Sequence, residues 1–326
     1  MKRIHYYISF IALLALVLPS CIAEDLSNCP DLKIKLIPDT VLTKEELKNA
    51  MLYIFNGAGE FVWSESVDPN PDRGAQNLKQ DLPSGDYTFV VWYNVGVDDK
   101  DVTPYKVKPD VFVPVDTVNK NNPTLKRTAE FYLPLPANDS IESLKLLPTF
   151  YGSVDYTIRK DTINDVDIDV FIQTNDINVT LLGLRGDEVN DDYEFVIKDR
   201  NARYSFDDAF LDSKNFYYTS KNVPAGGKEE VSTKLRVLKL SQELGAPNPE
   251  LTIANEAGRI ILGMPDNTNL IPIIIESYRM AHNGETPDLT KMHSFDVRVD
   301  LRGAKGASIT VNDWGDVPLD DITLDL

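Results

Sequence analysis

The sequence predicts an all-β protein with two β-sandwich domains in tandem. Apolar and polar residues alternate with period two along much of the chain, and helical spacing is far less frequent. About six short strands before residue 155 and about eight after it fit two sandwiches better than one large sheet. A chain of 326 residues with 42% hydrophobic residues is long enough to fill two such cores.

The charge balance argues against nucleic acid as a partner. The chain has 51 acidic and 33 basic residues and a formal net charge of -18, so phosphate backbones and anionic lipid repel it. It has only two cysteines, which excludes a disulfide framework and a CxxC metal site. We therefore expect apolar cores to hold the fold, and we expect no cofactor.

The first 20 residues have the layout of a signal peptide. Lys2 and Arg3 precede an uncharged run from Tyr6 to Leu18, and the helix breaker Pro19 follows. This run is shorter than the roughly 20 residues that a membrane-spanning helix needs. We therefore expect residues 1–20 to be removed and residues 21–30 to form a tether.

Cys21 is the predicted lipid anchor. The run Leu18-Pro19-Ser20-Cys21 resembles the lipobox of bacterial lipoproteins, in which the cysteine carries diacylglycerol and becomes the first residue. Two or more acyl chains give stable attachment, at about 0.8 kcal/mol per buried methylene. The alternative is an ordinary signal peptide with an incidental cysteine. If Cys21 carries the lipid, Cys29 is the only cysteine left with a free thiol, and we expect it to be a small buried hydrophobe.

The first sandwich, residues 31–155, is expected to open with a strand over Leu32–Ile37. A capping-box spacing predicts a short helix over Thr43–Ala50, and Asn56–Gly59 has the composition of a hairpin turn. The stretch "LPSGDYTFVVWYNV" is apolar on both faces, which predicts a strand covered on both sides. The polar, proline-punctuated residues 98–123 are expected to form long loops.

The second sandwich, residues 156–326, is expected to begin with two long strands. The stretch "DVDIDVFIQTNDINVTLLGL" forms two long alternating runs around residues 174–176, and further strands follow to "SITVNDW". Little else has helical spacing. The closing residues 316–326, "DVPLDDITLDL", alternate again, with Ile322, Leu324 and Leu326 on one face.

The motifs of common catalytic sites are missing. His282 and His293 remain after signal cleavage, and their spacing matches neither HExxH nor a zinc finger; there is no GxSxG elbow and no P-loop. Asp165, Asp167 and Asp169 lack the glycine and glutamate of an EF-hand loop, so we interpret them as the solvent face of a strand.

The three tryptophans allow two interpretations. Flat aromatic rings can stack on sugars, but Trp63, Trp92 and Trp314 each lie in or beside an alternating apolar run. This context favours roles in a core or an interface. An exposed pair of these rings would favour a sugar platform instead.

Several stretches in this order resemble one family. They are "SCIAEDLSNCP", "LYIFNGAGEFVW", "LPSGDYTFVVWYNV", "FYGSVDYTI" and "ITVNDWGDV", and together they look like the FimB/Mfa-type fimbrial anchor and accessory subunits of type V pili. The resemblance spans essentially the whole mature chain. It implies two transthyretin-like (immunoglobulin-like) sandwiches, an outer-membrane lipoprotein without enzyme activity, and fimbrial stalk or accessory pilins as partners.

 The resemblance thus implies a surface-exposed protein of the fimbrium and no catalytic role.

The same resemblance implies how the subunits join. A sandwich that lacks one strand exposes unpaired backbone groups and apolar pockets, which a strand from a neighbour can fill. An anchor that keeps its lipidated N-terminus should keep its first strand and have no open groove. We therefore expect residues 316–326 to be donated to a partner, with Ile322, Leu324 and Leu326 as the buried face. The alternative is that this tail completes its own sheet.

Two other functions and one modification stay open. A glycan-binding lipoprotein of a polysaccharide-uptake system would share the anchor and the sandwiches, and a lipoprotein hydrolase is a weaker third possibility. Four short Asp-Ser/Thr-apolar motifs resemble O-glycan acceptors of such bacteria, although turns have the same composition. The acceptor residues would be Thr40, Thr117, Ser140 and Thr162.

Overall fold

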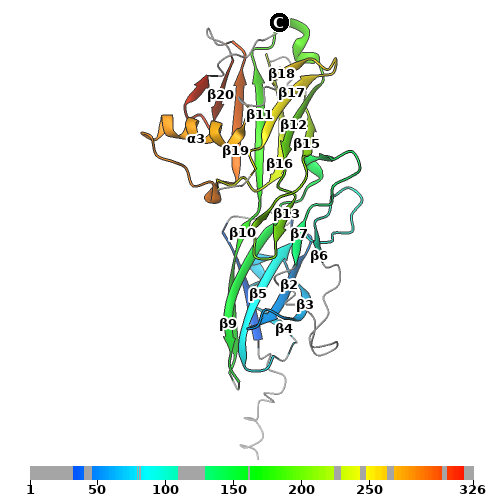
Figure 1. The fold of residues 1–326 in the computed structure, drawn as a ribbon, viewed down its shortest axis with the longest axis vertical. Helices are drawn as coiled ribbons and strands as arrows, with labels where there is room; N and C mark the ends of the chain where they lie inside the picture. Colours follow the sequence, from blue (N-terminus) through cyan, green and yellow to red (C-terminus); the bar gives the residue numbers. More distant parts are fainter. Residues whose placement is uncertain are drawn as a thin grey trace, which may run out of the picture.

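The protein is mainly β, as predicted. The computed structural model describes residues 32–39, 46–78, 80, 82–108, 129–160, 162–223, 229–242, 247–262, 268–302 and 307–318. The strands in these ranges form one seven-stranded sheet, two five-stranded sheets and one four-stranded sheet. No helix in the same ranges is long and apolar enough to cross a membrane. Figure 1 shows an elongated molecule with two lobes stacked along its long axis.

The lower lobe in Figure 1 is built on the seven-stranded sheet, whose order is β3-β2-β5-β9-β10-β1-β4. Its strands are β1 (Leu32–Pro38), β2 (Ala50–Asn56), β3 (Phe61–Val67), β4 (Gln76–Leu78), β5 (Gly85–Tyr93), β9 (Phe150–Ile158) and β10 (Asn164–Ile172). The long strands β9 and β10 pair only at one end, through Phe171 with Tyr151 and Ile172 with Phe150. The sheet therefore folds over here, and a core that includes Ile34, Leu52 and Phe89 fills the space between its two layers.

Gly152 on β9 permits the close approach of the two layers. A Cβ atom at this position would lie 2.5 Å from the backbone oxygen of Asp169 and 2.7 Å from the Cγ1 atom of Val170, both on β10. Real Cβ atoms do not come this close to backbone atoms, so only glycine fits without a shift of β9 or β10.

The upper lobe contains two five-stranded sheets, in the orders β16-β11-β19-β20-β21 and β18-β17-β12-β15-β8. The first consists of β11 (Thr174–Leu182), β16 (Glu230–Leu238), β19 (Ser294–Asp300), β20 (Ser308–Val311) and β21 (Asp316–Pro318). The second consists of β8 (Ser140–Glu142), β12 (Tyr193–Asp199), β15 (Phe216–Lys221), β17 (Glu250–Asn255) and β18 (Ile260–Leu262). The described ranges contain four short 3-10 helices between strands: η3 (Pro71–Arg73), η5 (Ser143–Lys145), η6 (Gly186–Asn190) and η7 (Leu289–Lys291).

A four-stranded sheet joins the lobes, in the order β14-β13-β7-β6. Its strands are β6 (Lys106–Lys108), β7 (Glu130–Tyr132), β13 (Arg203–Ser205) and β14 (Phe210–Leu211). Phe131 of this sheet stacks on Trp92 of β5 with ring centroids 4.1 Å apart. The outer face of β5 therefore belongs to a second core, which continues into the upper lobe. This confirms the prediction that the strand is covered on both sides.

The chain passes between the lobes at Gln173. This residue alone separates β10 from β11, and the two strands follow each other through the middle of Figure 1. The two long strands predicted here are present, but the break between them lies at Gln173 and not around residues 174–176, which are the first three of β11 and pair with β16. The division into domains at residue 155 stays a prediction, but β9 and β10 both pair within the first sheet, which therefore extends through Ile172.

The solvent face of β10 agrees with the sequence. Asp165, Asp167 and Asp169 are exposed, and the residues between them are buried. On the neighbouring strand β1, Lys33 stands opposite Asp165 and Lys35 opposite Asp167 in a parallel register. The interpretation as the polar face of a strand is confirmed.

The helix predicted over Thr43–Ala50 is wrong in its described part, because Glu46–Asn49 are not helical and Ala50 begins β2. The side chain of Asn94 accepts from the backbone N–H of Lys48 and donates to the carbonyl oxygen of Glu46. These bonds replace those that a helix would make within the segment.

One helix was not expected. Helix α3 (Leu270–Ala281) buries Leu270, Ile271, Ile273, Ile274 and Ser277 on one side and contacts β20 and β21. Its isoleucines have high strand propensity, and Pro272 lies in the first turn, where a missing N–H costs nothing. The spacing of the buried residues was the available signal for a helix.

The contact at Gly152 predicts a cost for any side chain there. We expect Gly152→Ala to lower the free energy of unfolding by about 1–3 kcal/mol, the usual cost of overpacking. Gly57→Ala is the control, since its Cβ would lie 3.4 Å from Asp86, an ordinary contact. Denaturant unfolding of both variants measures the difference. Equal stabilities would show that β9 and β10 do not approach each other this closely.

Candidate functional site

Strand β1 fills its own position in the first sheet. It pairs in parallel with β10 along its whole length and antiparallel with β4. Leu32, Ile34 and Leu36 are 2%, 0% and 5% exposed, so all three apolar side chains are buried. Burial of such side chains stabilises by about 1.5–3 kcal/mol each. The slot that this strand occupies is therefore closed to a strand from another molecule while β1 stays in place.

The end of β1 is held by both lobes. The backbone N–H of Asp39 donates to the carbonyl oxygen of Val170 at 3.0 Å, and its carboxylate lies 3.5 Å from Nε2 of His293, at the start of β19. Burial lowers the pKa of His293, although the charge of Asp39 opposes this shift. The pair of His293 and Asp39 thus forms a contact between the lobes.

Arg236 on β16 joins three further segments of the chain. Its guanidinium donates to Asp176 at 2.7 Å and to Glu46 at 2.9 Å, and to the carbonyl oxygen of Leu146 at 3.2 Å. Burial acts to raise the pKa of Asp176, but the hydrogen bonds from Arg236 and Lys234 outweigh it and the pKa is lowered. Because the Arg236 side chain is only 12% exposed, loss of a partner would leave a poorly solvated charge.

Helix α3 holds the segment that precedes the C-terminal tail through hydrogen bonds to Gly315. The Ser277 hydroxyl donates to the carbonyl oxygen of Gly315 at 2.7 Å, and the Gly315 N–H donates to the carbonyl oxygen of Ser277 at 3.1 Å. A side chain at Gly315 would collide with Met280. From this point Asp316–Pro318 form the edge strand β21 on β20. The first three residues of the predicted donor tail thus pair within their own sheet.

Most of the predicted site residues lie outside the described residues, and their roles stay predictions. Thr162 is exposed in the turn between β9 and β10, where its hydroxyl donates to the carbonyl oxygen of Arg159 at 3.2 Å. Ser140 is half-buried at the start of β8. An added sugar mass on the peptide that contains either residue would confirm glycosylation. The residues outside the described ranges are Cys21, Cys29, Thr40, Thr117, Ile322, Leu324 and Leu326.

The tryptophans do not form a pair. Trp92 is fully buried, Trp63 is 38% exposed on β3 of the lower lobe, and Trp314 packs edge-on against Tyr278 of α3 in the upper lobe. His282 stacks on Tyr278 with ring centroids 3.8 Å apart and also lies edge-on to Trp314, with ring centroids 6.0 Å apart. Trp63 and Trp314 thus lie in different lobes, and they do not make a shared sugar platform.

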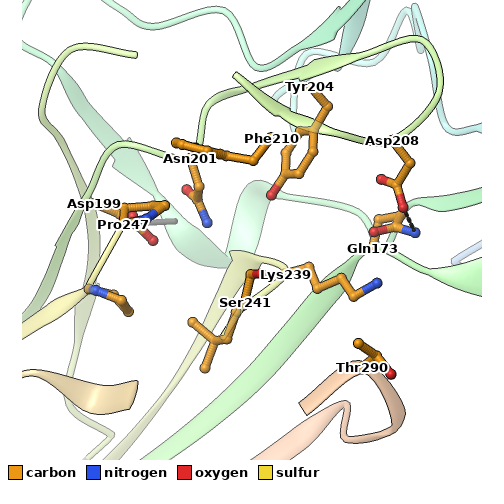
Figure 2. A pocket seen from close by; sticks show the side chains of 12 residues that line it. Gln173, Asp199, Asn201, Tyr204, Asp208, Phe210, Lys239, Ser241, Pro247 and Thr290 are labelled. Carbon is orange, nitrogen blue, oxygen red and sulfur yellow. Dashed lines mark hydrogen bonds between the residues drawn. The ribbon is translucent and has the colours of Figure 1, made fainter. Parts of the chain in front are cut away.

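A small pocket lies where the lobes meet, with a cavity volume of about 60 Å³. It is lined by the crossover residue Gln173, by the end of β12, by β13 and β14, and by the segment after β16. Figure 2 shows Asp199 and Pro247 on one side and Gln173 and Asp208 on the opposite side. In the same view, Asn201 and Tyr204 face Lys239 and Ser241 across the open space. Sequence spacing could not indicate this site, because its members come from distant parts of the chain.

Burial strongly perturbs the carboxyl group of Asp199 in the pocket. Its side chain is buried, with 3% of the residue exposed, and its Oδ1 accepts from the backbone N–H of Arg200 at 2.7 Å. Burial raises the pKa of Asp199 to about 7, although the hydrogen bond from Arg200 opposes this. The carboxyl group is therefore close to half-protonated at neutral pH.

The described ranges contain no group of three or more His, Cys, Asp or Glu residues that could hold a metal ion. The two histidines lie on different elements, one beside Asp39 and one on Tyr278.

A protein-family model matches residues 26–317 of the chain. The family is described as fimbrillin-A associated anchor proteins Mfa1 and Mfa2. A comparison with curated protein sequences gives no match.

Several solved structures share the fold. The fimbrial anchor protein Mfa2 from Porphyromonas gingivalis matches with a TM-score of 0.60 and 15% identity, over 87% of this chain and 97% of that one. A candidate adhesin from Bacteroides thetaiotaomicron matches with a TM-score of 0.65 and 17% identity, over 89% and 97%. A candidate polysaccharide-binding protein from the same species matches with a TM-score of 0.66 and 15% identity, over 88% and 98%. At these identities the likeness concerns the fold alone.

The burial of Asp199 predicts a pH-dependent stability. Because its pKa is higher in the folded protein than the ordinary value of 3.8, the folded state binds the proton more tightly, and stability falls as the pH rises from about 4 to about 7. We expect Asp199→Asn to remove this fall and to be more stable than the wild type at pH 8, by on the order of 2–4 kcal/mol.

Thermal unfolding between pH 4.5 and pH 8.5 measures this effect. Asp165→Asn, which changes an exposed carboxylate on β10, is the control, and we expect it to keep the wild-type profile. A wild-type loss of stability that persists in Asp199→Asn would refute the assignment to this carboxyl group.

Proposed function

Because the chain belongs to the family of fimbrillin-A associated anchor proteins Mfa1 and Mfa2, we propose that it is an outer-membrane lipoprotein that anchors fimbriae or regulates their assembly. The family associates with fimbriae at the cell surface, has pilins as partners and is not a family of enzymes. The single observation that carries the proposal is the family match over residues 26–317, which includes nearly every described strand.

The proposed architecture is two transthyretin-like sandwiches in tandem. The folded seven-stranded sheet with its enclosed core supports the first sandwich. The two five-stranded sheets, whose facing residues share one core, support the second. In this proposal the sandwiches meet at Gln173, and the four-stranded sheet covers their junction.

The proposed joining mechanism is strand donation. Strand β1 occupies its own slot in the first sheet, so this chain has no need to accept a strand there. The tail beyond Pro318 follows the edge strand β21 in the sequence, and its residues alternate between apolar and polar. A partner groove would bury Ile322, Leu324 and Leu326 and pair with the backbone between them.

Lipidation is tested at Cys21. We expect cells that are given an alkyne fatty acid to label the wild-type protein and not Cys21→Ala, which should leave the membrane fraction. Cys29→Ala is the matched control and should keep both the label and the membrane location. Equal labelling of wild type and Cys21→Ala would refute the anchor site.

Strand donation is tested by truncation after Pro318, which keeps β21 and removes residues 319–326. We expect a folded, membrane-bound protein and the loss of fimbriae into the medium, because the side chains that fill the partner groove are absent. Electron microscopy and blotting of cells and medium measure the retained fimbriae.

A pair of point variants separates the faces of the tail. Leu324→Asp should release fimbriae, because a charge would enter the apolar groove. Thr323→Asp, on the other face, should retain them. Full retention by the truncated protein, or equal effects of the two point variants, would exclude donation by this strand.

A further inference from the structure

The turn between β9 and β10 lies at the same end of the first sheet as the start of β1. Leu32, the first residue of β1, stands opposite Asn164, the first residue of β10. Figure 1 shows this turn at the lower end of the molecule, with the upper lobe at the opposite end. Four described residues of the turn form what we call the β9–β10 tip: Arg159, Lys160, Thr162 and Ile163. The tip therefore lies at the end where the chain enters β1.

The length of the chain before β1 limits how far this end can lie from a membrane. This limit rests on the proposed function, since it takes Cys21 as the lipid site. Only residues 22–31 separate Cys21 from Leu32. An extended chain spans at most about 3.3–3.6 Å per residue, so this stretch reaches at most roughly 40 Å. The end of the fold that carries the β9–β10 tip is therefore the end that is tied to the membrane.

Hydrogen bonds from Asn164, which is 2% exposed, hold the β9–β10 tip in one shape. Its Oδ1 accepts from the backbone N–H of Arg159 at 2.9 Å. Its Nδ2 donates to the carbonyl oxygens of Arg159 at 3.0 Å and of Thr162 at 3.1 Å. These bonds use backbone groups of the turn within the turn itself. The tip thus presents side chains to a partner, and not an open strand edge.

The side chains of the β9–β10 tip combine apolar and basic character. Ile163 is 57% exposed, and Arg159 and Lys160 are exposed as well. Neither basic side chain forms an ion pair with a described residue. At a bilayer surface, an apolar side chain can enter the boundary between headgroups and acyl chains, while Lys and Arg lie beside the lipid phosphates. The tip therefore has the chemistry that a lipid surface requires.

The acidity of the whole chain does not prevent this contact. The net charge is -18, but residues 159–163 contain two basic residues and one acidic residue. Charges in solution act over a Debye length of about 8 Å at physiological ionic strength. A lipid surface therefore responds mainly to the charges at the end that reaches it. Repulsion of acidic groups elsewhere favours the orientation in which the tip approaches the lipid.

We propose that the β9–β10 tip rests on the lipid headgroups of the membrane that carries the anchor. Ile163 enters the boundary between headgroups and acyl chains, and Arg159 and Lys160 lie beside lipid phosphates. The tip and the tether before β1 then hold the same end of the elongated molecule. The upper lobe, from which the C-terminal tail leaves, points away from the membrane.

Other exposed apolar residues fit this role less well. Ile260 is 62% exposed, but it lies on β18 in the upper lobe. Trp63 is 38% exposed on β3, a strand that contains Glu65 and no basic residue. Ile260 is therefore the natural control for Ile163.

The test is hydrogen exchange of the mature chain, residues 21–326, on vesicles of phosphatidylethanolamine and phosphatidylglycerol. Cys29→Ala leaves Cys21 as the only thiol, which a maleimide lipid in the vesicles captures. We expect amide exchange in residues 159–163 to slow about threefold or more on the vesicles, because covered amides exchange only when the contact opens. We expect no change in residues 255–260, the turn before β18.

Two variants of the β9–β10 tip should remove the slowing. Ile163→Asp replaces the apolar group with a charge that does not enter the bilayer, and the double variant Arg159→Glu, Lys160→Glu makes the tip repel lipid phosphates. Ile260→Asp is the matched control, a similarly exposed isoleucine of the upper lobe, and should keep the slowing. All of these positions are exposed, so the variants should stay folded.

The proposal is overturned if residues 159–163 exchange at the same rate on and off the vesicles, or if the slowing survives both tip variants. Equal slowing of residues 255–260 would also overturn it, because the molecule would then lie flat. A glycan on Thr162 of the native protein would overturn it too, since the sugar would keep the tip off the lipid.

This result is distinguishable from a failure of the anchor proposal. The chemically tethered protein reports on the tip whether or not cells attach a lipid to Cys21. Fatty-acid labelling of cells reports on the lipid alone.

Discussion

The burial of both faces of β5 is the constraint on which the arrangement of the molecule depends. Phe89 and Val91 point into the core of the folded first sheet, whereas Val90 and Trp92 point into the core that continues through the upper lobe. Truncation of a buried aromatic residue typically costs about 3–5 kcal/mol, a large part of the 5–15 kcal/mol that stabilises a domain. Neither lobe can therefore separate from the other without exposing apolar surface that the other now covers.

Polar contacts between the two lobes fix the relative orientation of the lobes around this shared core. Arg236 bonds to Glu46 across 190 positions of the chain, and Asp39 at the end of β1 meets His293 of the upper lobe. The single residue between β10 and β11 leaves little freedom of rotation at the junction.

The sequence and the structure agree where a pattern is local. The alternation in β1 and β10 matches buried and exposed residues one by one. The prediction and the structure differ where a group that is distant in the sequence makes the deciding contact. The side chain of Asn94 holds Glu46 and Lys48 in a non-helical path despite the capping-box spacing. The isoleucines of α3 form a helix because one of its faces packs on β20 and β21.

Local sequence patterns predicted the β class and the polar and apolar faces of the strands. They also carry the resemblance to fimbrial anchors and the predictions for Cys21 and the tail. These depend on neighbours in the chain, since side chains alternate across a strand at every second residue. Only the tertiary structure decided that the first sheet extends through Ile172 and that β21 pairs with β20. It also decided that Gln173, Asp199 and Lys239 line one pocket. These contacts between residues that are distant in the sequence depend on how separate strands pack. The burial of apolar faces favours the strand pairs that fit each other in shape and area, whatever their positions in the sequence.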